Sequence, residues 1–169
     1  FATALIQKNK KFIFEPRAFD REHALEVQLP FLQKTFANFK IVPVIVGQAS
    51  FELCGELAKS LDELIGGRKD VLVVVSSDMS HFHDAAFAEK MDGQTIETIK
   101  KLDAENFWQG CGTGKMEMCG WHPVTTALLF AQRRGLAAEF LRYAHSGNVT
   151  GEMDRVVGYT SILFYKPAG

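Results

Sequence analysis

The stretch DVLVVVSSDMSH, residues 70–81, decides the fold that the sequence predicts. Its first part is a continuous apolar run, which is typical of a central strand covered on both faces of a sheet. Serine, aspartate and histidine follow directly after the run. In open α/β folds ligands bind beyond the carboxyl ends of the strands, so we expect these polar residues to line a functional crevice.

Helical and strand-like patterns alternate on both sides of this run. Apolar residues at helical spacing predict helices over 1–9, 21–36, 50–65, 84–102 and 123–135, with a short helix at 104–108. Apolar runs predict further strands over 12–14, 41–47, 138–149 and 156–165, and Pro43 indicates an edge position or a bulge. Strands separated by helices indicate an α/β fold with a largely parallel sheet and helices on both faces.

Several residues mark the expected ends of these helices. Ser50 and Asp84 are suited to cap helix N-termini, and Gly135 is suited to end a helix. Pro30 predicts a bend or a restart within 21–36, because proline breaks the backbone ladder of a helix. Pro123 predicts the first position of the helix that it opens.

The composition is that of an ordinary folded domain. The chain has 169 residues, of which 47% are hydrophobic and 23% charged, and its formal net charge is -1. This balance predicts one domain with a substantial core, and it gives no basis for nucleic-acid binding. No apolar stretch approaches the roughly 20 residues that cross a membrane. Three cysteines are few and odd in number, which favours a cytoplasmic protein over a disulfide framework. Because the chain starts at Phe1 rather than Met, we expect it to be a piece of a longer protein.

Asp78 and His81 are the first candidates for chemistry. They lie three residues apart, directly after the predicted strand. A carboxylate beside an imidazole can orient the ring, fix its tautomer or share a metal ion with it. The structural alternative is that Asp78 caps the next helix and His81 lines the surface. The position at a strand end favours a functional pair, whereas we expect His83 to be exposed.

Cys119 is the candidate nucleophile or metal ligand. It lies just before the helix that Pro123 opens, and the positive end of a helix dipole favours a thiolate. His122 is placed to cap that helix or to act as a second functional group. The alternative is a buried and inert cysteine, which is what we expect of Cys54 and Cys111.

A third cluster combines His23 with Glu22 and Glu26 in the segment EHALE. His23 and Glu26 are three residues apart, so they are neighbours on one face of a helix. Two carboxylates beside an imidazole are favourable where they bind a cation or orient the ring. A solvated helix face is the structural alternative.

Four segments together resemble the Memo family, whose prokaryotic members are called AmmeMemoRadiSam system protein B. These segments are EHALEVQLPFLQ, SSDMSHF, CGWHPV and SGNVTGEMDRVVGYTSILFY. They occur in the family's order and extend over most of the chain. The resemblance implies a three-layer α/β/α fold with a largely parallel or mixed central sheet, similar to class III extradiol dioxygenases of the LigB type.

The resemblance also implies roles for single residues. Cys119 corresponds to the family's metal-binding cysteine. We therefore expect Asp78, His81 and His23 to be catalytic, Cys119 and His81 to bind a metal, and Glu26 and His122 to line the pocket. Family members are longer at the N-terminus, and two further metal-binding histidines of the family have no counterpart here. The complete site would hold iron or copper, whereas this chain by itself is compatible with a metal-free, partial site.

The function implied by the resemblance is a metal-associated redox or dioxygenase-like pocket whose reaction is not specified. An AMMECR1-like protein and a radical SAM protein are the partners that it suggests, and a homo-oligomer stays open. Two alternatives remain. One is a non-catalytic module that binds a protein or peptide in the same cleft. The other is a hydrolase that uses Cys119 with His81 or His122.

Overall fold

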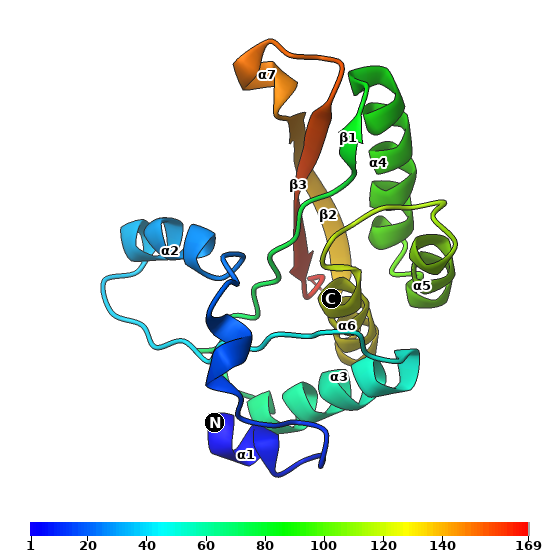
Figure 1. Cartoon of the computed structure of the whole chain (residues 1–169). Coiled ribbons are helices and arrows are strands. Elements are labelled where there is room, and N and C mark those ends of the chain that lie inside the picture. The colour runs from blue at the N-terminus through cyan, green and yellow to red at the C-terminus, as the bar shows by residue number, and fades with distance from the viewer. Residues whose placement is uncertain (169) are drawn as a thin grey trace.

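The computed structural model describes residues 1–168 and has a mixed α/β architecture (Figure 1). In chain order the elements are α1 (Ala2–Ile6), the 3₁₀ turns η1 (Pro16–Phe19) and η2 (Glu26–Gln28), α2 (Leu29–Thr35), α3 (Phe51–Ile65), β1 (His81–His83), α4 (Ala85–Lys100), α5 (Ala104–Gly112), α6 (Trp121–Arg134), β2 (Ala137–His145), α7 (Gly147–Thr150) and β3 (Val156–Tyr165).

The described part of the chain forms one small antiparallel sheet with the strand order β1-β3-β2. β2 and β3 pair along their length, from Ala137 opposite Tyr165 to His145 opposite Gly158. β1 adds a short pairing at the start of β3, where His81 lies opposite Val157. The α/β class is therefore confirmed. The expected largely parallel central sheet is wrong for residues 1–168, because every pairing in the sheet is antiparallel.

The predicted sheet differs from the observed sheet because it included strands over 41–47 and 70–78. Both segments are extended, yet neither joins the sheet, and the same is true of 12–14. An apolar run shows that a segment is suited to a strand, but a strand forms only where a neighbouring backbone accepts its hydrogen bonds. The predicted strand over 156–165 is confirmed. The strand predicted over 138–149 ends as β2 at His145, and α7 begins two residues later.

The helices follow the predicted signals closely. Ser50 caps α3 by accepting a hydrogen bond from the Leu53 amide, and Asp84 caps α4 by accepting one from the Phe87 amide. Gly135 ends α6 with a φ of 61°, which suits glycine. The expected restart within 21–36 is confirmed, since η2 ends at Gln28 and α2 begins at Leu29 with Pro30 as its second residue. Pro123 is not the first residue of its helix, since α6 already begins at Trp121.

Three helices and the sheet enclose the main core. α4 packs against β2 and β3, and α5 lies between α4 and α6 (Figure 1). Met79, Phe107 and Leu128 are almost completely buried in this core. Met79 directly follows Asp78, so core packing anchors the segment that carries the candidate site. In residues 1–168, no helix has the combination of length and apolar character that a membrane crossing requires.

Candidate metal centre

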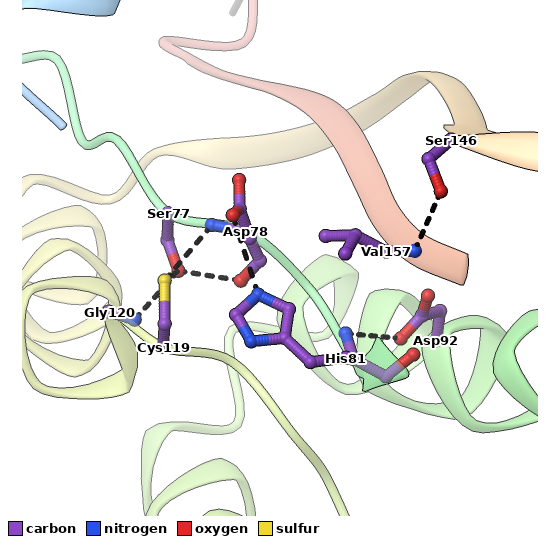
Figure 2. A network of polar contacts seen from close by, with 9 residues as sticks. Ser77, Asp78, His81, Asp92, Cys119, Gly120, Ser146 and Val157 are labelled. Carbon is purple, nitrogen blue, oxygen red and sulfur yellow. Dashed lines mark hydrogen bonds and ion pairs between the residues drawn. The ribbon is translucent and has the colours of Figure 1, made fainter. Parts of the chain in front are cut away.

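The side chains of Asp78, His81 and Cys119 lie close together, although Cys119 is 41 residues from Asp78 in the sequence. One ligand atom from each, namely a carboxylate oxygen, an imidazole nitrogen and the Cys119 sulfur, lies within 4.8 Å of the others. Figure 2 shows the His81 ring next to the Asp78 side chain, with the Cys119 sulfur atom close to both residues. Two of the three polar clusters singled out from the sequence therefore lie side by side, and both contribute potential ligand atoms.

The Nε2 atom of His81 is buried and has no hydrogen-bond partner among the described residues. It lies 3.4 Å from Asp78 Oδ2, but the pair does not have hydrogen-bond geometry. An unpaired polar atom in a buried position is unfavourable unless something else binds it. His81 Nε2 is therefore free to act as a ligand, and it lies beside the Asp78 carboxylate.

The sulfur atom of Cys119 is held against the Ser77–Asp78 segment. The Asp78 amide donates a hydrogen bond to Sγ over 3.3 Å, and the Ser77 hydroxyl lies 3.6 Å from the same atom. The Gly120 amide donates to Ser77 Oγ over 2.8 Å. A side chain at Gly120 would meet the Cβ atom of Ser77 at 2.8 Å, so glycine is required for this close approach. An amide directed at sulfur is a favourable partner for an anionic sulfur ligand.

A buried carboxylate positions the backbone next to His81. Asp92, on α4, is fully buried and accepts hydrogen bonds from the Ser80 amide over 3.1 Å and the Tyr143 hydroxyl over 2.7 Å. Burial and the neighbouring Asp92 carboxylate raise the pKa of Tyr143, so its hydroxyl remains a donor. On the other side, the amide of Gly158 donates to the Ser80 carbonyl over 3.0 Å. Both the amide and the carbonyl of Ser80 are thus hydrogen-bonded, which restricts the backbone from which the His81 side chain projects.

β1 has an unusual backbone at its centre. Phe82 has a φ of 63°, a conformation that costs a bulky residue about 1–3 kcal/mol. Its ring is exposed and lies under the Arg155 guanidinium at 5.1 Å. On either side of it, His81 faces the Cys119 cluster while His83 lies 2.9 Å from Glu117 Oε2. His83 is half-buried and paired, so the expectation that it is exposed is wrong.

A cavity of about 190 Å³ lies beside the cluster. His81 and Cys119 both contribute to its wall, and Glu117 contributes a carboxylate. The other lining residues are mostly apolar or sulfur-containing, including Met116, Met118, Cys111 and Trp121. A larger, shallow hollow of about 720 Å³ along α4 contains no member of the cluster, so we assign the candidate site to the smaller cavity on chemical grounds.

The other expected site residues lie elsewhere. His122 is the second residue of α6 and does not cap it, because Gly120 occupies that position. Its ring packs 3.9 Å from the Trp121 ring and 5.5 Å from the Trp108 ring, between ring centroids. Burial in this aromatic cluster lowers the pKa of His122. His122 therefore packs against aromatic side chains, an arrangement that spacing along the sequence does not predict.

His23 and Glu26 are exposed and do not join the ligand cluster of the described residues. Glu26 begins η2, whereas His23 precedes that turn, so the two do not share a helical face. Their segment nevertheless approaches the site. The Gln28 side-chain amide donates to Ser76 Oγ over 2.9 Å, two residues from Asp78.

Three residues near the site were not singled out from the sequence. Ser77 contacts Cys119 directly, and its place in the Ser-Ser-Asp cluster was the available signal. Glu117 pairs with His83 across 34 residues of sequence, a relationship that no local pattern contains. Tyr159, on β3, has a raised pKa, first because of burial and second because of the negative charge of Asp78.

The fold and the cluster define an α/β protein with a cysteine–histidine–aspartate site at the edge of its sheet. Residues 1–163 match the family described as Memo-like protein. A MEMO1 family protein of Caldivirga maquilingensis is 35% identical over 161 residues, which is 94% of this chain and 57% of that protein. A MEMO1 family protein of Methanobrevibacter smithii is 36% identical over 168 residues, which is 97% of this chain and 59% of that protein. The chain therefore belongs to the Memo-like family, and it spans little more than half the length of these relatives.

Proposed function

We propose that the chain contributes a metal-binding site to a redox or dioxygenase-like protein, with Cys119, His81 and Asp78 as ligands to iron or copper. The observation that carries the proposal is the convergence of three ligand atoms within 4.8 Å. The buried Nε2 atom of His81, which has no hydrogen-bond partner among residues 1–168, supports it. A thiolate, an imidazole and a carboxylate form a ligand set that suits either metal.

Each residue has a distinct task in this proposal. Cys119 supplies the anionic ligand, and the Asp78 amide stabilises its charge. His81 supplies a neutral nitrogen whose direction is fixed through Ser80 and Asp92. The Asp78 side chain is about half exposed, so it can bind the metal or accept a proton from a ligand in the adjacent cavity.

A bound iron or copper ion would supply one-electron chemistry and Lewis acidity at the cavity wall. His83 and Glu117 form an acid–base pair near the same cavity, and Glu117 is the member that reaches its wall. The wall of the cavity thus combines two potential metal ligands, His81 and Cys119, with the Glu117 carboxylate.

A cysteine-dependent hydrolase is less well supported. That chemistry needs an imidazole within hydrogen-bond reach of the thiol. In residues 1–168 neither His81 nor His122 makes a hydrogen bond to Cys119, whose sulfur instead contacts the Asp78 amide and the Ser77 hydroxyl. The ring of His122 packs instead against tryptophan.

Metal uptake tests the proposal. The chain and its Cys119→Ala variant are dialysed anaerobically against Fe(II) and, separately, against Cu(I), and retained metal is measured by mass spectrometry. His83→Gln is the matched control, because it alters a histidine of the same strand outside the ligand cluster. We expect the parent chain and the control to retain one of the two metals and Cys119→Ala to lose it. Equal retention by all three proteins would exclude Cys119 as a ligand.

A further inference from the structure

A hollow of about 720 Å³ lies along α4. One of its walls is a stripe of exposed α4 residues at helical spacing, namely Lys90, Gln94, Glu97 and Lys101. The other wall comes from the segment after α5, which passes beside α4 and contributes Lys115 and Met116 (Figure 1). The amides of Lys115 and Met116 both donate hydrogen bonds to the Gly110 carbonyl, over 2.9 and 3.1 Å. The hollow therefore lies between two elements that the fold holds in place.

Gly93 lies in the middle of α4 and lines this hollow. Glycine makes a helix less stable than alanine does, because it loses more backbone freedom on folding. Internal packing does not require glycine here, since a Cβ atom at Gly93 would meet nothing within 4 Å and its φ is not positive. The missing side chain instead leaves open space in the hollow. Such a position is suited to a ligand that approaches the helix backbone closely.

The charges around the hollow favour a negatively charged ligand. Three exposed lysines line it, and within residues 1–168 none of them forms an ion pair: Lys90, Lys101 and Lys115. The two carboxylates of its walls already have neighbours of their own. Glu97 Oε1 lies 2.6 Å from Lys100 Nζ, and Glu89 Oε1 lies 3.4 Å from His145 Nε2. The three ammonium groups are therefore available to carboxylates from outside the chain.

The shape of the hollow favours an elongated ligand over a compact anion. The rise of an α-helix places Lys90 and Lys101 about 17 Å apart along α4. An extended peptide covers that length with about five residues. Met116 and the nearly buried Thr98 add apolar surface between the lysines. A peptide that combines carboxylates with apolar side chains matches both features, whereas a polyphosphate matches the charge alone.

We propose that the hollow along α4 is a docking site for an acidic peptide segment of a partner protein. Its three lysines pair with carboxylates of the segment, and the space beside Gly93 lets the peptide backbone approach the helix. The proposal does not depend on metal binding, because no member of the candidate metal centre lines the hollow. The Cys119→Ala variant should therefore bind such a peptide as well as the parent chain does.

Fluorescence anisotropy of a labelled peptide tests the proposal. The probe is a peptide of about eight residues, long enough to span the hollow, that alternates glutamate with leucine and carries fluorescein at one end. A matched peptide has glutamine in place of glutamate, so it keeps the length and loses the charge. We expect the chain to bind the glutamate peptide at least about tenfold more tightly than the glutamine peptide. Added salt should reduce this difference, because it screens exposed charges.

Charge reversal on the two walls makes the outcome specific to the hollow. Lys90→Glu combined with Lys115→Glu should weaken binding of the glutamate peptide by about tenfold or more, because like charges then face the peptide. Lys59→Glu combined with Lys166→Glu is the matched control, since both lysines are exposed and neither lines the hollow. The control changes the net charge by the same amount and should leave the affinity within about twofold of the parent value.

Gly93→Gln tests the open space separately. Glutamine is a good helix former, so the urea concentration at the midpoint of unfolding should stay the same or rise. The new side chain occupies the space beside the helix backbone, so the affinity for the glutamate peptide should fall by about fivefold or more. A loss of affinity in a variant that is at least as stable as the parent chain assigns the peptide to this part of α4.

Four results would overturn the proposal. The first is equal affinity for the glutamate and glutamine peptides. The second is an equal loss of affinity in the two lysine double variants, which would place the peptide elsewhere on the chain. The third is tighter binding of inorganic tripolyphosphate than of the glutamate peptide, which would make a compact anion the ligand. The fourth is self-association of the chain that the Lys90→Glu and Lys115→Glu pair abolishes, which would make a second copy the occupant.

Discussion

The amide of Asp78 donates a hydrogen bond to Cys119 Sγ over 3.3 Å, and the amide of Cys119 donates to the Asp78 carbonyl over 3.3 Å. This reciprocal pair joins two segments that are 41 residues apart. It fixes the sulfur atom beside the Asp78 carboxylate and the His81 ring (Figure 2). The candidate metal centre therefore depends on backbone geometry as much as on the identity of its side chains.

The first prediction concerns the relative reactivity of the three thiols. Cys119 is exposed, whereas burial raises the pKa of Cys111 to about 12 and also raises the pKa of Cys54. Because the thiolate is the reactive form, we expect Cys119 to be alkylated well before the other two. Peptide mapping after timed alkylation measures this. Equal labelling of Cys111 and Cys119 at early times would contradict the arrangement of the site.

The second prediction concerns the glycine that faces Asp92. A Cβ atom at Gly158 would collide with Asp92 Oδ2 and meet the Met79 Cβ atom at 3.0 Å. Gly158→Ala should therefore lower the free energy of unfolding by about 1–3 kcal/mol, as other overpacked sites do. Gly93→Ala is the matched control, because a Cβ atom there meets nothing within 4 Å inside α4. The control should raise the free energy of unfolding by about 0.5–1 kcal/mol. Urea unfolding measures the change in the free energy of unfolding for both variants. Similar changes in the two variants would contradict the close contact at Gly158.

The third prediction concerns the buried carboxylate itself. Asp92→Ala leaves the Ser80 amide and the Tyr143 hydroxyl without their acceptor. We expect a loss of about 2–4 kcal/mol in the free energy of unfolding, since each unsatisfied buried donor is costly. The exposed Asp154 provides the control, and its alanine variant should be nearly neutral. If the two variants unfold at the same urea concentration, Asp92 does not anchor this segment.

The fourth prediction is a pH dependence that arises from His122. Burial lowers its pKa in the folded chain below the ordinary value of 6.5. Between the lowered pKa and 6.5 the unfolded chain binds more protons than the folded chain, so stability increases with pH in that window. The contribution of His122 is complete above pH 6.5 and is lost as the pH falls through the folded-state pKa.

The fluorescence of Trp108 and Trp121, which pack against His122, reports unfolding in this experiment. In the His122→Phe variant, which keeps an aromatic ring at this position, the slope of stability against pH below 6.5 should be smaller. Identical slopes for the parent chain and the variant would show that His122 does not contribute.

The elements that the sequence predicted well carry their own local signals. The strand at 156–165 and the caps Ser50 and Asp84 are confirmed because alternation and capping act within a few residues. The apolar run at 71–75 was equally clear, but whether it pairs depends on a partner that the run itself does not contain. Residue type and position at the ends of predicted elements also identified Asp78, His81 and Cys119 as candidate site residues. It did not predict the stacking of His122 on tryptophan or the pairing of His83 with Glu117, since both depend on the folded arrangement.

The most direct test of the central claim is X-ray absorption spectroscopy at the edge of the metal that the chain retains after anaerobic loading. If Cys119 is a ligand, the spectrum of the parent chain contains one sulfur scatterer in the coordination shell, and that scatterer is absent from the Cys119→Ser variant. A coordination shell without sulfur in the parent chain, or an unchanged sulfur scatterer in the variant, would contradict the proposed site.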